Sequence, residues 1–154
     1  MIEAALYHFE RAGFESCSVA ELAAKAGVTT GSLYHHFGSK LGLYLVVRSD
    51  VERRITDRME GAAAGTGKQG RPALLAAVLV AFDATVRFDA CRLLGEPPPA
   101  GHEDPVEAAL RSLEPETVLA AAIVVAAWRE ALLRVADGDP AESARAALRY
   151  VLNA

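Results

Sequence analysis

The side chains with the greatest capacity for hydrogen bonding cluster in one short segment, residues 29–36. Every residue here except Gly31 and Leu33 carries a hydroxyl group or an imidazole ring. These groups donate or accept hydrogen bonds through the side chain, and none of them is needed for a hydrophobic core. Gly31 would let another backbone approach closely. The segment therefore has the chemistry of a surface that recognises polar groups on a partner.

Two short helices joined by a tight turn are predicted to hold this segment. Ser18 and Glu21 have the spacing of a capping box, which predicts the start of the first helix. Gly27 is expected to end that helix with a positive φ angle. Thr29 is placed to cap the second helix. Helix, turn and helix in this order are the form of a helix-turn-helix motif, whose second helix enters the major groove of DNA.

The spacing of small, apolar and aromatic residues over 23–40 points to a known family. The run A-x-x-A-G-V-x-x-G-x-L-Y-x-H-F-x-S-K resembles the signature of TetR-type (tetracycline-repressor-like) transcriptional regulators. The preceding run AALYHFERAGFESCSV is similar to the first helix and entry loop of that family. The resemblance covers roughly the first third of the chain. Leu41 and Gly42 stand where the family usually has an acidic residue nearby.

The resemblance implies contacts with DNA for nine residues, carried over by position. Those expected to face base edges are Thr29, Thr30, Gly31, Ser32 and His35. Those expected to hold phosphates are Ser18, Tyr34, His36 and Lys40. Phosphate contacts set the position of a protein on the duplex, and base contacts set its choice of sequence.

The resemblance also implies an all-α fold with two domains. We expect a three-helix, helix-turn-helix DNA-binding domain over residues 1–46 and a helical ligand-binding and dimerisation domain over 47–154. The function it implies is a homodimeric repressor that an unknown small molecule releases from its DNA operator. That ligand would tilt the helix joining the two domains and so lower the affinity for DNA by linkage.

Composition sets broad limits on the chain. Its 154 residues are 52 % hydrophobic and 6 % aromatic, with a net charge of −4. Abundant alanine favours helices. The negative charge is not that of a general nucleic-acid binder, so attraction to DNA must come from local placement of residues. Cys17 and Cys91 are too far apart for a C-x-x-C motif, which favours a reduced, cytoplasmic protein. No signal peptide is visible, and no apolar run reaches the ~20 residues that would span a membrane.

Glycine and proline divide the remaining sequence into expected helices. The first should cover residues 2–14, ended by Gly13, and a long helix should cover 41–60, ended by Gly61. A glycine-rich connector follows, which lacks the pattern of a phosphate-binding loop. Further helices are expected over 72–94, 105–113, 115–136 and 140–153.

The last two helices are predicted to form the dimer. The middle of helix 115–136 is apolar on all sides, so both of its faces need cover. One side would pack in its own domain and the other against a second copy. Together with helix 140–153 it could then form a four-helix bundle across a two-fold axis. The alternative is that the pair only completes its own domain.

The ligand of the second domain is expected to lie between its helices. Candidate lining residues are Phe82, Phe88, Cys91 and Trp128. The alternative for each of these side chains is ordinary packing in the core. The effector is expected to be small and apolar.

Two other function classes were weighed. An enzyme is not expected, because no histidine is assigned to Cys91 as a base and neither G-x-S-x-G nor H-E-x-x-H occurs. His35 and His36 diverge by ~100° on a helix, so we expect no metal site, and we expect no cofactor. The second alternative is a helical ligand-binding or interaction protein that has lost DNA binding. This alternative is suggested by the nearly neutral charge of the N-terminal part and by the lack of a basic arm before the first helix.

Overall fold

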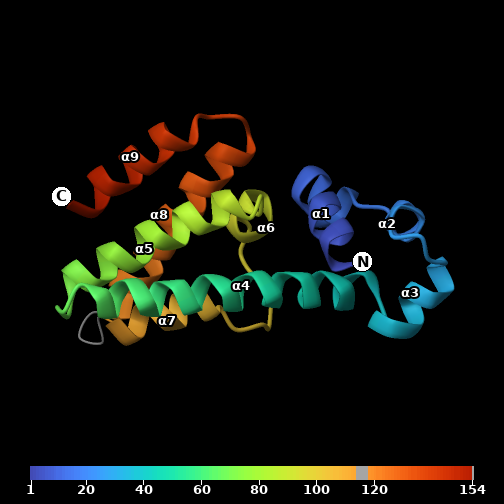
Figure 1. Ribbon diagram of the computed structural model, residues 1–154, viewed down its shortest axis with the longest axis horizontal. Helices are drawn as coiled ribbons and strands as arrows, with labels where there is room; N and C mark the ends of the chain where they lie inside the picture. The colour runs from blue at the N-terminus through green and yellow to red at the C-terminus, as the bar shows by residue number, and fades with distance from the viewer. Residues whose placement is uncertain (114–117, 154) are drawn as a thin grey trace.

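The chain folds into helices joined by short loops, as a computed structural model shows for residues 1–113 and 118–153 (Figure 1). No strand forms within these two ranges, which confirms the all-α class. The helices are α1 Ile2–Ser16, α2 Val19–Lys25, α3 Thr30–Phe37, α4 Lys40–Gly65, α5 Arg71–Arg87, α6 Cys91–Gly95, α7 Pro105–Leu113, α8 Val118–Ala136 and α9 Ala141–Asn153. No helix of the described residues is long and apolar enough to cross a membrane.

The long helix α4 runs through both parts of the molecule (Figure 1). At its start it meets α1 and α3, which together with α2 we call the N-terminal unit. Farther along, it packs against α5 and α7, which with α6, α8 and α9 we call the C-terminal bundle. The short helix α6 lies between the two parts and contacts α1, α4 and α8.

The turn between α2 and α3 forms as the sequence predicts. Gly27 has a φ of 67°, which L side chains rarely adopt. The Thr29 hydroxyl accepts a hydrogen bond from the backbone N–H of Ser32 at 3.1 Å and so caps α3. Leu33 is 1 % exposed, because the inner side of α3 packs into the core. These local features leave the outer side of α3 open.

The first two helices depart from expectation in detail. The first helix continues past Gly13 to Ser16, across a kink at which Gly13 has φ 72° and ψ 168°. Ser18 is the N-cap of α2, so this helix begins where the sequence predicts, but the Ser18 side chain makes no capping hydrogen bond within the described structure. The first turn of α2 is held instead by the backbone, with the N–H of Leu22 donating to the Ser18 carbonyl.

The long helix α4 does not end at Gly61 as expected but continues to Gly65. A glycine inside a helix costs about 1 kcal/mol relative to alanine, which packing readily offsets. Met59 and Ala63, on either side of Gly61, are both buried. The helix ends where the Thr66 hydroxyl donates to the Ala63 carbonyl and Gly67 takes a φ of 62°.

The expected single helix over 72–94 is divided into α5 and α6. The chain turns at Asp89, a non-glycine residue with a positive φ, 52°. Aspartate tolerates this conformation better than most residues, so no glycine or proline marks the break. The turn lets Gly95 of α6 approach α8 so closely that a Cβ there would lie 2.8 Å from the Leu133 side chain.

The last three helices follow the expected order. Asp104 caps α7 by accepting hydrogen bonds from the N–H groups of Val106 and Glu107, both at 3.1 Å. The break expected at Glu114-Pro115, and the first residues of the helix expected over 115–136, lie outside the described residues. From Val118 that helix and the final one are as predicted, within a residue or two.

Gly42 of α4 should resist substitution, whereas Gly61 should tolerate it. A Cβ at Gly42 would lie 2.0 Å from the Phe37 carbonyl oxygen, but one at Gly61 would meet no described atom within 4 Å. We expect Gly42→Ala to lower the free energy of unfolding by at least about 1–3 kcal/mol. Gly61→Ala should raise it by up to about 1 kcal/mol. Urea unfolding measures both, and equal midpoints for the two variants would contradict this close approach.

Candidate nucleic-acid interface

The residues expected to contact DNA lie together on the outer side of α3. Six are exposed: Thr29, Thr30, Gly31, Tyr34, His35 and His36. Ser32 is partly buried between them. We call these seven residues the polar face of α3. It presents hydroxyl and imidazole groups on a helix of eight residues whose opposite side is fixed in the core. Such a helix end is well suited to reach base edges in a groove.

The two histidines of this face point in different directions. The ring centroids of His35 and His36 are 5.8 Å apart and the rings are inclined at 64°. Within residues 1–113 and 118–153, no group of three or more His, Cys, Asp or Glu side chains is placed to hold a metal ion. Both imidazoles are exposed on α3.

Lys40 has a different position from the one expected. Its ammonium group donates to the backbone carbonyls of Glu15 and Cys17, both at 3.1 Å. It also lies 4.6 Å from the centre of the Phe14 ring. These contacts tie the first residue of α4 to the end of α1. Lys40 thus stabilises the N-terminal unit through contacts inside it. Ser18, the other expected phosphate contact outside α3, is partly buried at the start of α2.

The four candidate ligand-lining residues do not surround one cavity. Phe82 and Trp128 are each 1 % exposed and belong to the core of the C-terminal bundle. Phe88 is stacked by two arginines, with the guanidinium carbons of Arg54 and Arg58 at 4.0 and 4.8 Å from its ring centre. The indole N–H of Trp128 has no acceptor in the described part of the chain.

Cys91 lines a separate pocket of about 400 Å³ between α1, α6 and the end of α8. Burial raises the pKa of its thiol to about 12, and the nearby carboxylates of Glu10 and Asp89 add to the effect. A thiol is nucleophilic only as thiolate, so Cys91 is unreactive at neutral pH. This chemistry gives no support to an enzyme built on Cys91.

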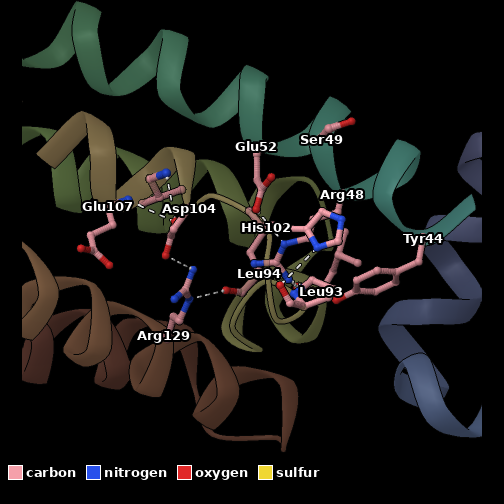
Figure 2. Close-up of polar contacts among 12 residues, drawn as sticks. Tyr44, Arg48, Ser49, Glu52, Leu93, Leu94, His102, Asp104, Glu107 and Arg129 are labelled. Atoms are coloured by element: carbon pink, nitrogen blue, oxygen red, sulfur yellow. Dashed lines mark hydrogen bonds and ion pairs between the residues drawn. The ribbon is translucent and has the colours of Figure 1, made fainter. Parts of the chain in front are cut away.

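Sequence reasoning missed a buried polar cluster at the junction of α4 with α6 (Figure 2). Arg48 is 2 % exposed, and its guanidinium donates to Glu52 at 2.7 Å, Tyr44 at 3.1 Å and the Leu93 carbonyl at 2.6 Å. Arg48 and Glu52 stand at the boundary between the apolar and charged stretches of α4. The signal that could have found them is their position beside Val47 and Val51, which are fully buried.

The same junction continues toward α7 and α8. Arg129 of α8 lies 2.6 Å from the Asp104 carboxylate and donates to the Leu94 carbonyl at 3.4 Å (Figure 2). Burial raises the pKa of Glu52, and the positive charge of Arg48 partly opposes this rise. Four buried or half-buried charges are thus paired, which is how charged groups persist in an interior.

A second exposed surface lies on α8 and α9 and is apolar. We call it the α8–α9 surface. It is defined by four large exposed side chains, Leu119, Ile123, Tyr150 and Val151, with exposed fractions of 73, 67, 78 and 57 %. Two adjoining grooves of about 600 and 390 Å³ flank them, lined mainly by alanine and aliphatic residues of these helices. Apolar side chains exposed side by side in this way indicate a surface that another protein covers.

Comparisons with known proteins agree with this geometry. Residues 1–47 match the family model of bacterial regulatory proteins of the tetR family. Over 73 residues the chain is 38 % identical to the HTH-type transcriptional activator FasR of Mycolicibacterium smegmatis, a match that covers 46 % of this chain. That match spans 32 % of FasR, so the chain covers about a third of the length of this relative.

Two solved structures share the fold along the whole chain. PfmR, a TetR family transcriptional regulator of Thermus thermophilus, aligns with a TM-score of 0.57 and 21 % identity over 99 % of this chain and 96 % of its own. A Rhodococcus sp. protein assigned to the same family aligns with a TM-score of 0.59 and 19 % identity, over 99 % of this chain and 94 % of its own. At such identities these two show the fold alone.

Fold and site together define an all-α helix-turn-helix protein with a helical C-terminal bundle. Residues 1–47 carry the sequence pattern of the tetR family of bacterial regulatory proteins, and the whole chain shares the fold of two solved structures from that family. FasR is named as a transcriptional activator and PfmR as a transcriptional regulator.

The internal role of Lys40 predicts a loss of stability when its ammonium group is removed. Lys40→Met keeps most of the aliphatic stem but removes the ammonium group, which makes both hydrogen bonds to main-chain carbonyls and lies over the Phe14 ring. We expect a free energy of unfolding lower by about 1–2 kcal/mol, measured in urea. Lys25→Met, at an exposed lysine of α2, is the control and should unfold like the wild type. If Lys40→Met is as stable as the wild type, the internal role is contradicted, and the expected role of Lys40 in phosphate binding is favoured instead.

Proposed function

We propose that this protein is a dimeric DNA-binding transcriptional regulator whose polar face of α3 reads the major groove. The observation that carries the proposal is the exposure of that face on a helix whose inner side is anchored by Leu33. Thr29, Thr30, Gly31, Ser32 and His35 would face base edges. Ser18, Tyr34 and His36 would meet phosphates, with Lys40 acting mainly as a support. Residues 1–46 would form the DNA-binding domain and residues 47–154 the ligand-binding and dimerisation domain.

The proposed dimer pairs the α8–α9 surface with its counterpart on a second copy. This surface would be the self-complementary patch that a two-fold axis requires. The alanines that line the adjoining grooves allow close helix approach, and the exposed aliphatic side chains of the surface would then be buried. The two copies of α3 would reach half-sites separated by one turn of DNA, about 34–36 Å.

The proposed effector is a small molecule bound inside the C-terminal bundle. The indole N–H of Trp128, which finds no acceptor among the described residues, supports this. A buried donor of this kind gains a hydrogen bond from a ligand with an acceptor group. A molecule that entered beside Trp128 would displace packed helices and tilt α4. We propose repression relieved by this ligand as the mode of action. The relative FasR is named as an activator, so the sign of regulation is measured directly in a reporter assay.

One observation favours a different function. Lys40 uses its ammonium group internally, which leaves the nearly neutral N-terminal unit with fewer cations for phosphates. This arrangement favours a helical ligand-binding or interaction protein that no longer binds DNA. Failure of the intact dimer to retain any duplex would support this alternative.

The dimer is tested by placing a charge on the α8–α9 surface. Ile123→Arg should convert the protein to a monomer in sedimentation velocity, because an arginine in an apolar interface loses its hydration. Val46→Arg is the matched control, since Val46 is also an exposed β-branched residue, 40 % exposed, on another helix. It should remain dimeric. A dimeric Ile123→Arg protein would show that the copies pair elsewhere.

DNA binding is tested by selecting bound duplexes from a random pool with the wild-type protein. We expect an inverted repeat, because a two-fold dimer presents two identical α3 helices. His35→Ala should relax the choice of base at one position of each half-site, at a cost of about 1–3 kcal/mol. Tyr34→Phe should weaken binding on every sequence. Tyr7→Phe changes an exposed tyrosine of α1, outside both the polar face of α3 and the α8–α9 surface, and should bind normally. An enriched sequence without symmetry would contradict the proposed geometry.

A further inference from the structure

The carboxylate of Glu10 links the N-terminal unit to the C-terminal bundle. Glu10 lies on α1, and its two oxygens accept hydrogen bonds from consecutive backbone N–H groups of α6. The distances are 2.8 Å to the nitrogen of Arg92 and 2.9 Å to that of Leu93. Hydrogen bonds to an ionised carboxylate are stronger than those between neutral groups. This contact joins two segments that are 82 and 83 residues apart in the sequence.

The link is formed in a partly buried place. Burial raises the pKa of Glu10, while the two N–H groups oppose that effect. Asp89 raises the pKa further and Arg92 lowers it. Keeping a carboxylate ionised in a partly buried place costs free energy. The two hydrogen bonds offset this cost only while α1 stays against α6.

Helix α6 is itself fixed by other parts of the C-terminal bundle and by α4. Arg48 of α4 donates to the Leu93 carbonyl at 2.6 Å, so one residue of α6 is bound from both sides. Arg92 pairs with Asp137, after the end of α8, at 2.7 Å. Gly95 packs tightly against Leu133 of α8. Because of these contacts, α6 moves with α4 and α8.

The N-terminal unit has one continuous connection to the bundle, through α4. Helices α2 and α3 pack on each other and against α1 and α4. A single helix can bend and rotate, so it does not by itself set the angle of the unit it carries. Gly13, with φ 72°, forms the kink of α1 and lies beside Glu96, the residue that follows α6. Glu10 binds at this second point of attachment.

We propose that Glu10 is a positioning residue that fixes the angle of the N-terminal unit and thereby sets the half-site spacing that the dimer accepts. This inference rests on the proposed function. Two attachments, α4 and Glu10 on α6, hold the polar face of α3 at one orientation. Without the second, the unit samples a range of angles around α4.

The first test measures affinity for operators with altered spacers. The operator comes from the selection described above, and its central spacer is shortened or lengthened by one and two base pairs. Wild type should lose at least about tenfold in affinity at each altered spacing. Glu10→Ala should bind all spacings within about threefold of one another. Glu3→Gln, at an exposed carboxylate of the same helix, should keep the wild-type profile.

The spacing profile separates positioning from a merely structural role. A variant that is only less stable loses affinity equally at every spacing, and that result for Glu10→Ala would overturn the proposal. An unchanged wild-type profile would overturn it as well. Glu10→Gln offers a milder variant in case Glu10→Ala does not fold, because its amide keeps a single oxygen acceptor for two N–H groups. Circular dichroism and sedimentation confirm that each variant is folded and dimeric.

The second test needs no DNA and separates this inference from the proposed function. Spin labels at Lys25→Cys and Lys68→Cys, two exposed positions in different parts of the molecule, report the distance between the parts. The native cysteines are buried, 4 and 5 % exposed, and should remain unlabelled. With labelled protein diluted in unlabelled protein, wild type and Glu3→Gln should give one narrow distance distribution. Glu10→Ala should broaden it. Equal widths would overturn the positioning role, whether or not the protein binds DNA.

Discussion

The arrangement of the whole molecule depends on the burial of Arg48. A guanidinium taken out of water costs several kcal/mol unless its hydrogen bonds are replaced. Glu52, Tyr44 and the Leu93 carbonyl supply these partners within the junction of α4 and α6. Glu52 and Tyr44 lie on α4 with Arg48, so it is the bond to the Leu93 carbonyl that ties the guanidinium to α6. If α4 slid or turned against α6, the buried guanidinium would lose this bond and keep its partners on its own helix. A hydrophobic contact, which is not directional, would fix the register of these helices less firmly.

Although α6 has five residues, it contacts α1, α4 and α8 and so connects both parts of the molecule. It donates hydrogen bonds to Glu10 of α1 and to Asp137 after the end of α8, and it accepts one from Arg48 of α4. Its close contact with α8 exists because Gly95 has no side chain. A change of packing in the C-terminal bundle would thus reach α6 first, and α4 and α1 through it. These contacts are a physical route for coupling between the C-terminal bundle and the N-terminal unit.

The N-terminal unit is organised on a smaller scale by caps and tight approaches. Thr29 and Ser39 each accept a hydrogen bond from the N–H three residues later, which fixes where α3 and α4 begin. Gly42, where the family usually has an acidic residue nearby, is required because the Phe37 carbonyl lies directly over it. What looked in the sequence like a weakened helix start is a steric requirement of the turn between α3 and α4.

The sequence by itself determined the elements whose signals are local. The turn at Gly27, the caps at Thr29 and Asp104, and the polar face of α3 all follow from residues close to one another in the chain. Tertiary structure alone decided the continuation of α4 through Gly61, the turn at Asp89 and the inward positions of Arg48, Lys40 and Glu10. For the three charged side chains the deciding partners lie on other segments, up to 83 residues away. Backbone propensity and periodicity describe how a segment folds along itself, but the free energy of burying a charge depends on partners that only the packed chain brings together.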